Sequence, residues 1–563
     1  MYSMSKLLAV LWRRVISMWP CHQQFLSRIH LDRPRQDPYQ HLQRTNQFCM
    51  AKYLSLSIFR SVEKEETVQM KIKNIVLTNA AESVMRDQRS WLKRSSQLGA
   101  LMLAVALTGC STYRPWINEI ADLKKNVETD QAPIVAPVSA RTPASRATPP
   151  VVAAVTLSGG GARAAAFGLG VLRELKATQF KVAGQATTLL DQVGLISGVS
   201  GGSILAGHYA VFGDETLTRF EPDFLLASFQ DDLITQLFAP QLLHRLTSPW
   251  YGRSHILQKR LDDLYGSRTF RDIKARPNAP DLIVTATDLT TGAPFEFTRE
   301  QFKLICSDLD STPLSFAIAA SSAVPILLSP MTLKNHAGKC APTAKATNSA
   351  IRPPERAAGA GFRARMLEFS AESYRDAEER PFIHLVDGGV SDNTGARLII
   401  DRLFAGGSIA SAFPDAPAGS IRRMILITVN SERGLEQRID SSDTTPSTGQ
   451  VIETLVFGAG ARGTQFTFEM LSDDARRWQK ELLSSRGKPG SPFAADAELH
   501  IINVSLSDVP DDKIRRSLLR VPTAFTIQAD DVKALQRAGA DTLRETPAFM
   551  LMKNGLSKLE KLP

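Results

Sequence analysis

Cysteine is scarce in this sequence, and long apolar runs are missing. Five cysteines occur among 563 residues, and no Cys/His spacing is typical of a zinc site. The apolar segment 98–107 is ten residues long, whereas a helix needs about 20 such residues to cross a bilayer. No internal repeat is evident. These absences argue against a domain stabilised by zinc, against a membrane-spanning helix at residues 98–107, and against a repeat array.

Positive charge is concentrated in the N-terminal part of the chain. The formal net charge is +10, of which residues 1–109 contribute +9, with 16 Lys and Arg against 7 Asp and Glu, leaving +1 for the rest. A basic surplus usually indicates nucleic acid or an anionic surface as the partner. Because the remainder is nearly neutral, we expect no nucleic-acid partner. With 43% hydrophobic and 22% charged residues, the chain can bury a large core.

Residues 85–109 have the layout of a secretory signal. Basic residues after Met85 precede the apolar segment, and Gly109 and Cys110 follow it. The stretch 107–110, Leu-Thr-Gly-Cys, resembles the bacterial lipoprotein lipobox, in which the cysteine becomes the lipidated N-terminus. This resemblance implies a lipid-anchored envelope protein, and Ser111 indicates the outer membrane, facing the periplasm. The alternative is an internal apolar segment that ends at a chance cysteine.

The signal-like segment does not begin the sequence. We interpret residues 1–84 as an extension from a start codon assigned too far upstream, or as unstructured.

Cleavage before Cys110 would leave Cys306 and Cys340 as the remaining thiols. In an oxidising periplasm they could form a disulfide. Two separate buried thiols are the alternative, because a sequence does not show whether two Cα atoms come within bonding distance.

Strand and helix patterns alternate after residue 150. Residues 151–157 form a continuous apolar run, which is typical of a buried strand in a parallel sheet. Further runs predict strands at 193–196, 282–287, 382–386, 424–429 and 499–504, with helical patterns between them, as at 164–176 and 393–404. This alternation predicts an α/β fold of three layers, with helices on both sides of a mainly parallel sheet.

Composition sets the expected boundaries of this domain. Residues 131–150 are rich in Pro, Ala, Thr and Ser, so we expect 110–150 to be the lipidated cysteine followed by an extended tether. The hydrolase-like domain is predicted over 151–550. Residues 336–380 interrupt the alternation with Ala, Gly and Arg and are interpreted as an insertion, and 551–563 as a C-terminal tail.

A serine between glycines is the most informative motif. Residues 198–202 read Gly-Val-Ser-Gly-Gly, directly after an apolar run and before a helical pattern. This is the G-x-S-x-G pattern of a nucleophile elbow, a sharp turn that raises the serine hydroxyl above a sheet. Glycines on both sides remove the Cβ atoms that such a turn would bring into collision. Ser200 is therefore the candidate nucleophile.

Two further glycine-rich elements complete a pattern. Residues 158–163 read Ser-Gly-Gly-Gly-Ala-Arg, and 387–389 read Asp-Gly-Gly. In this order the three motifs resemble the patatin-like phospholipase family, and residues 286–292 and 320–325 are similar to further elements of it. The resemblance covers about residues 151–550. One departure is Ala164, where the family usually has glycine.

The resemblance implies a division of roles. Ser200 would attack an acyl ester and Asp387 would act as its base, a dyad without histidine. Backbone N–H groups of Gly159, Gly160 and Gly161 could converge on an oxyanion, while Arg163 would hold that loop or add positive potential.

Each of these residues also has a simpler interpretation. Asp387 could cap the turn that follows it, and Asp392 and Asn393 fit caps of the next helix. A dinucleotide-binding loop is disfavoured, because it would need glycine at Ala164.

The resemblance implies a lipid acyl hydrolase that acts on phospholipids or lysophospholipids, with no metal and no organic cofactor. One alternative is a general esterase with a Ser200, Asp387 and His500 triad in the chain order of α/β-hydrolases. His500 lies within an apparent strand, however, whereas a triad histidine usually needs a loop. Another alternative is a non-catalytic envelope lipoprotein on a hydrolase fold.

The lipobox makes a direct prediction. If Cys110 is acylated, Cys110→Ser should yield an unacylated protein that stays as the uncleaved precursor or leaves the membrane fraction. Mass spectrometry of the mature N-terminus measures this. An unmodified chain that begins upstream of Met85 would contradict the prediction.

Overall fold

The computed structural model describes residues 111–121, 150–237, 239–340, 362–397, 399–401, 408–432, 443–447, 451 and 459–559. The predicted upstream extension, the signal segment, Cys110 and the stretch 122–149 lie outside the described residues.

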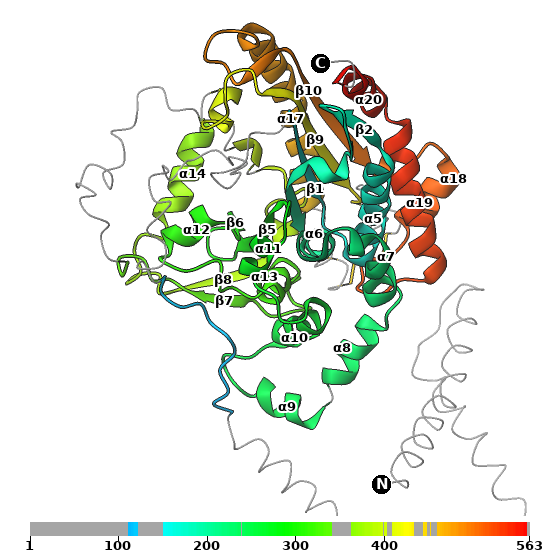
Figure 1. Cartoon of the computed structure of the whole chain (residues 1–563). Helices are drawn as coiled ribbons and strands as arrows, with labels where there is room; N and C mark the ends of the chain where they lie inside the picture. Colours follow the sequence, from blue (N-terminus) through cyan, green and yellow to red (C-terminus); the bar gives the residue numbers. More distant parts are fainter. Residues whose placement is uncertain are drawn as a thin grey trace, which may run out of the picture. The chain divides into compact units, whose positions relative to one another are not determined.

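An eight-stranded sheet forms the centre of the described fold, in the order β10-β9-β1-β4-β5-β8-β7, with β6 beside β5 (Figure 1). The parallel strands are β1 (Val151–Leu157), β4 (Val193–Val199), β5 (Asp281–Asp288), β9 (Ile421–Asn430) and β10 (Phe493–Ser505). The antiparallel strands are β6 (Pro294–Glu296), β7 (Met331–Lys334) and β8 (Phe382–Asp387). Each predicted strand is present, and the prediction of a mainly parallel α/β sheet is confirmed.

Alternation along the strands shows that both faces of the sheet are covered. In β9, Ile425 and Ile427 join the larger core cluster, whereas Met424 and Leu426 join a second cluster on the opposite face. Because successive side chains of a strand point to opposite faces, each cluster is one layer of side chains between sheet and helices. The predicted three-layer arrangement is therefore confirmed.

Helices α5 (Gly161–Ala177), α19 (Ala529–Glu545) and α20 (Pro547–Leu559) pack on one face, and the long helix α17 (Ala459–Ser485) packs on the other (Figure 1). The other helices are α6 (Gly201–Phe212), α7 (Thr216–Phe220), α8 (Phe229–Leu237), α9 (Pro240–Leu246), α10 (Arg253–Tyr265), α11 (Phe270–Ala275), α12 (Arg299–Leu304), α13 (Leu314–Ser321), α14 (Phe362–Glu372) and α18 (Asp512–Leu519). A small hairpin of β2 (Gln179–Val182) and β3 (Gln185–Thr188) follows α5. None of the described helices is long and apolar enough to cross a membrane.

The predicted C-terminal boundary is wrong. Residues 551–559 are not a tail but the second half of α20, which packs against β10 and β2. Phe549, Met552, Leu556 and Leu559 recur at helical spacing and are buried in the larger core. The hydrolase domain therefore extends at least to Leu559, because a helix with one apolar face is stable only when that face is covered.

The predicted N-terminal boundary also changes. Residues 111–121 were expected within an extended tether, but they pack on the domain. The Asn118 side chain donates to Ser307 Oγ and to the carbonyl of Lys334, and Ile120 bridges to Ser307. Trp116 packs edge-on against Phe316. Residues 122–149 therefore connect two segments that are both fixed to the fold.

The proposed insertion is in part an element of the core. Its described residues include Tyr374, which is buried and donates its hydroxyl to Asp288 Oδ2 at 2.9 Å. Arg380 forms an ion pair with the same carboxylate at 2.7 Å. Cys306 and Cys340 form a disulfide with their Cα atoms 5.5 Å apart, which fixes the start of this region to the end of α12. Asp288 at the end of β5 is thereby neutralised.

The corrected boundary predicts a stability effect. Met552 lies beyond the predicted boundary and is fully buried, so Met552→Ala should lower the free energy of unfolding by about 2–5 kcal/mol, the usual cost of a large-to-small change in a core. Leu551 lies on the other side of α20 with 65% of its surface exposed, so Leu551→Ala serves as the matched control and should change it by less than about 0.5 kcal/mol. Urea denaturation measures both. Equal values for the two variants would mean that α20 does not pack as described.

Candidate active site

Ser200 has the backbone geometry of a nucleophile elbow. It lies between β4 and α6 with φ 48° and ψ −122°, a conformation that is rare for a residue with a side chain. Such strain persists only where surrounding contacts enforce it, and it clusters at functional sites. The predicted turn is therefore present, and it aims the serine away from the sheet at the end of β4.

Close backbone contacts explain why glycines surround this serine. A Cβ on Gly201 would lie 2.1 Å from the carbonyl oxygen of Gly161, and one on Gly202 would lie 2.4 Å from that of Leu157. Both distances are far below van der Waals contact, and the atoms approached are backbone atoms that no rotamer change can move. The serine turn and the glycine loop after β1 are thus packed directly against each other.

Asp387 approaches Ser200 from across β5. It is the last residue of β8, which runs antiparallel to β5. Asp387 pairs with Ala286 of β5, while Val199 pairs with the preceding residue, Thr285. The ends of β4 and β8 therefore meet on either side of β5. Ser200 Oγ donates to Asp387 Oδ2 at 2.9 Å.

The Asp387 carboxylate has two different partners. Its Oδ1 accepts from the Gly389 N–H at 2.8 Å, which is the capping contact of the simpler interpretation, and its Oδ2 accepts from Ser200. Burial raises the pKa of Asp387 to about 6, and the two hydrogen bonds oppose that rise. A carboxylate in this position is a stronger base than an exposed aspartate, and it remains mostly ionised at neutral pH.

The segment that contains residues 320–325 holds both residues in place. The Ser200 N–H donates to Ser321 Oγ at 2.8 Å, and Ser321 in turn donates to the carbonyl of Thr285 at 2.6 Å. The Asp387 N–H donates to the carbonyl of Ala323 at 2.9 Å. This segment therefore fixes the separation of the two side chains.

The glycine loop supplies fewer oxyanion donors than predicted. The Gly159 N–H donates to the carbonyl of Asn393 at 3.0 Å, so the prediction of Gly159 as a donor is wrong. Gly160 and Gly161 have φ of 136° and 62°, and within the described residues their N–H groups make no hydrogen bond. Both amides belong to the first turn of α5, where they can receive an anion.

Arg163 is a structural support of this loop. Its side chain is buried, with Nε donating to the carbonyl of Ser431 at 3.1 Å and Nη1 to that of Val521 at 2.8 Å. Of the two roles considered for Arg163, these contacts favour holding the loop. They tie the start of α5 to the segments that follow β9 and α18.

Asn393 was predicted to cap the next helix, but its side chain lies in the site instead. A Cβ on Gly159 would lie 2.3 Å from Asn393 Oδ1, and one on Gly389 would lie 3.0 Å from the same atom, so the Asn393 side chain separates the two glycine turns. It also hydrogen-bonds Glu432, whose pKa burial raises to about 7. Asp392, by contrast, acts as the predicted cap and accepts from the N–H groups of Thr394 and Arg397.

His500 lies far from this site. It is in the middle of β10, three strands from β4 in the sheet order, where its Nε2 lies 3.2 Å from Glu498 Oε2. The structure therefore does not bring together the alternative triad of Ser200, Asp387 and His500.

Among the described residues, no cluster of three His, Cys, Asp or Glu side chains is arranged to hold a metal ion.

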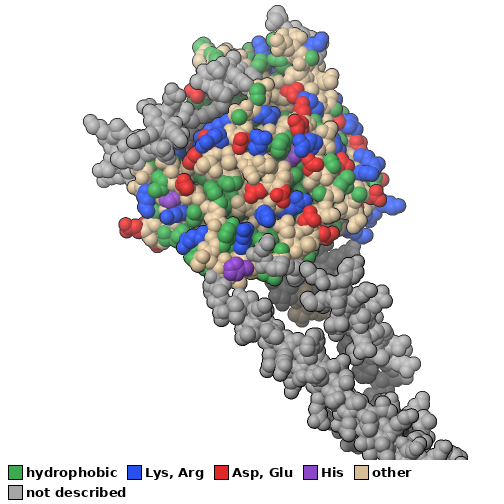
Figure 2. Space-filling view, turned by 60° about the horizontal axis from the view of Figure 1, so that its bottom comes forward, with side chains coloured by type: hydrophobic (Ala, Val, Ile, Leu, Met, Phe, Trp, Pro, Cys, Tyr) green, Lys and Arg blue, Asp and Glu red, His purple; other side chains and the backbone are tan. Residues whose placement is uncertain are grey.

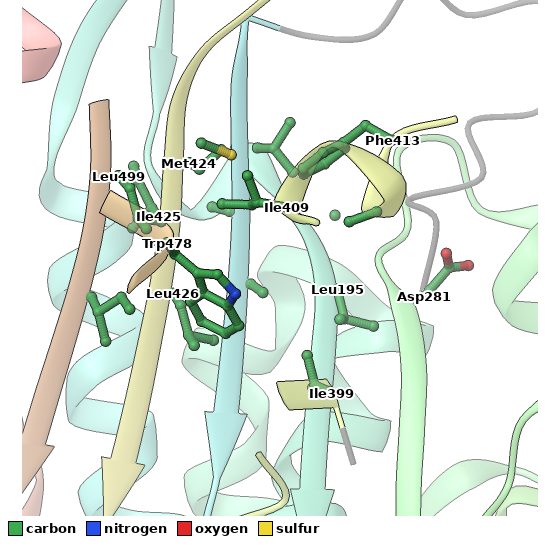
Figure 3. Close-up of a pocket in the computed structure, with 16 residues that line it drawn as sticks. Leu195, Asp281, Ile399, Ile409, Phe413, Met424, Ile425, Leu426, Trp478 and Leu499 are labelled. Carbon is green, nitrogen blue, oxygen red and sulfur yellow. The ribbon is translucent and has the colours of Figure 1, made fainter. Parts of the chain in front are cut away.

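An apolar pocket of about 110 Å³ lies between the sheet and α17 (Figure 3). Leu195, Met424, Leu426 and Trp478 are among its lining residues. From β4 it includes Gly194 and Leu195, near the start of that strand, whereas Ser200 follows the end of the strand. The pocket is therefore a separate feature from the serine site.

The α/β/α fold places a strained serine beside a buried carboxylate and near two unbonded loop amides, which is the geometry of a nucleophile elbow. Residues 155–400 match the sequence profile of the patatin-like phospholipase family. The matched region contains the three motifs, which confirms the resemblance that they carry. The comparison with curated proteins found no match to this chain.

Solved structures with a similar arrangement have low sequence identity. Human GIVD cytosolic phospholipase A2 is 14% identical, with a TM-score of 0.37, over 73% of this chain and 63% of the human chain. VipD from Legionella pneumophila is 11% identical, with a TM-score of 0.28, over 80% of this chain and 72% of VipD. The chain thus spans less than two thirds of the human enzyme.

Burial of Asp387 predicts a pH-dependent stability. Its raised pKa means that the folded state binds the proton more tightly than the unfolded chain, so its contribution to stability falls as pH rises from about 4 to about 6. Asp387→Asn removes this ionisation while keeping the side-chain shape. The variant should therefore exceed the wild type in free energy of unfolding by about 3 kcal/mol at pH 7.5.

Urea denaturation at pH 4 and pH 7.5 measures this effect. At pH 4 the wild-type carboxyl is largely protonated when folded, so the difference between the two proteins should shrink towards zero. A difference that is the same at both pH values would contradict the assignment of the pH dependence to Asp387.

Proposed function

We propose that this protein is a serine acyl hydrolase that cleaves fatty acyl esters of phospholipids or lysophospholipids through a dyad of Ser200 and Asp387. The observation that carries the proposal is the 2.9 Å hydrogen bond from Ser200 Oγ to Asp387 Oδ2, beside the unbonded amides of Gly160 and Gly161. The match of residues 155–400 to the patatin-like phospholipase family supports the lipid ester as substrate class.

The first half of the reaction forms an acyl-enzyme. Ser200 Oγ attacks the acyl carbonyl carbon, and the hydroxyl proton passes to Asp387 Oδ2. Charge develops on the carbonyl oxygen, where the N–H groups of Gly160 and Gly161 stabilise it. When the tetrahedral intermediate collapses, the bond to the alcohol oxygen breaks, and this oxygen takes the proton from Asp387. The lysolipid or alcohol leaves.

Water completes the cycle. Asp387, again ionised, takes a proton from the water that attacks the acyl-Ser200 ester, and the same two amides hold the second oxyanion. Collapse releases the fatty acid and returns the proton to Ser200. In each half of the reaction one proton thus passes to Asp387 and on from it. A pKa near 6 suits this role, because the group both accepts and donates a proton near neutral pH.

The proposal includes a location. The lipobox at 107–110 supports lipidation of Cys110 after cleavage, which would anchor the enzyme in the bacterial envelope on the periplasmic side. The disulfide between Cys306 and Cys340 is consistent with an oxidising compartment. The anchor would keep the site close to its lipid substrate.

The dyad predicts which substitutions abolish turnover. Ser200→Ala and Asp387→Asn should each lower the hydrolysis of a chromogenic ester by several orders of magnitude, because they remove the nucleophile and its base. Both should keep the wild-type circular dichroism spectrum. His500→Ala is the control: its folded fraction should keep most of the turnover, since His500 contacts Glu498 and not the site.

Two results would overturn the proposal. A folded His500→Ala protein as inactive as Ser200→Ala would favour a triad esterase. Equal turnover by the wild type and Ser200→Ala would favour the non-catalytic envelope lipoprotein.

A further inference from the structure

Three separate segments form one surface beside the active site. They are residues 111–117, 240–253 and 324–330, which we call the docking face. The Ser111 N–H donates to Thr247 Oγ1 at 3.1 Å, and Ser248 Oγ donates to the carbonyl of Tyr113 at 2.7 Å. Arg253 Nη2 donates to the carbonyl of Ile326 at 2.5 Å. These contacts join the first described segment, the region around α9, and the loop after α13.

The docking face combines exposed apolar side chains with basic ones. Ile326 and Leu327 are 59% and 67% exposed, and Leu243 and Trp250 are 49% and 43% exposed. Large apolar residues at a loop tip are costly in water, so their exposure indicates a partner. Figure 2, which brings the lower side of Figure 1 forward, shows hydrophobic side chains interspersed with both basic and acidic ones on that side of the molecule.

The charge of this face has one sign. Its three segments contain Arg114, Arg245 and Arg253 but no Asp or Glu. Arg114 stacks over the Trp250 ring at 3.8 Å, and Arg245 lies over a second ring, that of Tyr113, at 4.3 Å. Aromatic rings at the polar boundary with cations beside them are typical of a membrane interface, where the rings lie among headgroups and the cations meet phosphates.

Backbone strain keeps the most exposed residues turned outward. Ile326 has φ 74°, which is a genuine outlier for a β-branched residue. The Leu328 N–H donates to the carbonyl of Val324 at 2.9 Å, which closes the turn, and Ser254 Oγ donates to the carbonyl of Ser329. These contacts maintain the strained conformation of Ile326. Because the Ile326 side chain is mostly exposed, the strain does not serve to pack it into the core.

This loop leads directly to the catalytic pair. Its first turn follows Ala323, whose carbonyl accepts from the Asp387 N–H, and Ser321, whose hydroxyl accepts from the Ser200 N–H. A surface that receives Ile326 and Leu327 therefore contacts the loop only a few positions after Ser321, the residue that bonds to Ser200. Ser111, at the other end of the face, is the residue after the proposed lipidation site.

We propose that the docking face is the surface by which the enzyme sits on a phospholipid bilayer, with Ile326 and Leu327 in the apolar boundary and the arginines at anionic headgroups. This inference rests on the proposed function, because it assumes a lipid substrate. It adds that the enzyme meets its substrate in one fixed orientation, rather than only being held near it by an acyl anchor.

Paired variants test the apolar part of the face in the full chain. Ile326→Ser with Leu327→Ser should lower turnover of phosphatidylglycerol vesicles by about tenfold or more, because two side chains leave the apolar boundary. Turnover of a soluble short-chain ester should stay within about twofold of the wild type. The matched control is Leu483→Ser with Leu551→Ser, which are 56% and 65% exposed on α17 and α20 and should change neither rate.

The charges are tested by vesicle composition. Arg245→Gln and Arg253→Gln should each lower the preference for phosphatidylglycerol over phosphatidylcholine vesicles by about fivefold, the effect of one basic residue near an anionic surface. Brominated lipids in the vesicles should quench the fluorescence of Trp250. The Trp250→Phe variant should lack this part of the quenching.

The outcomes separate the two proposals. If the Ile326→Ser and Leu327→Ser pair loses turnover equally on vesicles and on soluble ester, residues 324–330 only shape the site. If vesicle turnover is unchanged and Trp250 is not quenched, the bilayer binds elsewhere. Either result overturns the docking face. If the wild type hydrolyses no ester, the proposed function fails, while bromolipid quenching still decides whether this face meets the bilayer.

Discussion

The site depends on a contact between two stretches of backbone. The turn after β4 and the turn after β1 approach so closely that Gly201 lies against the carbonyl of Gly161, and Gly202 against that of Leu157. This contact packs the first turn of α5, which carries the unbonded amides of Gly160 and Gly161, against the turn that holds Ser200. It also maintains the strained φ of Ser200, because the turn cannot relax without separating the two loops. The proposed nucleophile and the proposed oxyanion donors are therefore positioned by one packing constraint.

Burial of the carboxylate follows from the same arrangement. Asp387 lies where β8 ends against β5, and its ionised form is supported by the Gly389 N–H and the Ser200 hydroxyl. Two hydrogen bonds do not offset the loss of water, so its pKa rises to about 6. Burying the ionised carboxylate of Asp387 lowers the stability of the fold. Such a cost is expected where a site keeps a base away from solvent. Arg163 and Asn393 contribute by holding the loops around it.

Sequence patterns predicted the strands, the layers and the serine turn, because each depends on local periodicity or on glycine. They did not predict the direction of β8, since a strand has the same pattern whether it pairs parallel or antiparallel. Nor did they distinguish Gly159 from Gly160: the difference is a hydrogen bond to Asn393, more than 200 positions away in the chain. The spacing of Phe549, Met552 and Leu556 does indicate a helix with one apolar face, and this pattern continues past the predicted boundary at residue 550. The packing of residues 111–121 depends on partners such as Ser307 that no local pattern identifies.

The packing of residues 111–121 also changes how an anchor at Cys110 would act. A long flexible tether between membrane and domain would let the enzyme rotate freely, and the site would face the bilayer only part of the time. Here the segment after Cys110 is bonded to the region around α9, and that region is bonded to the loop that supports Ser200 and Asp387. An anchor at this position and exposed apolar residues on the same face would favour a single orientation. Because lipid molecules in a bilayer do not leave it readily, holding the site towards them raises the local substrate concentration that the enzyme meets.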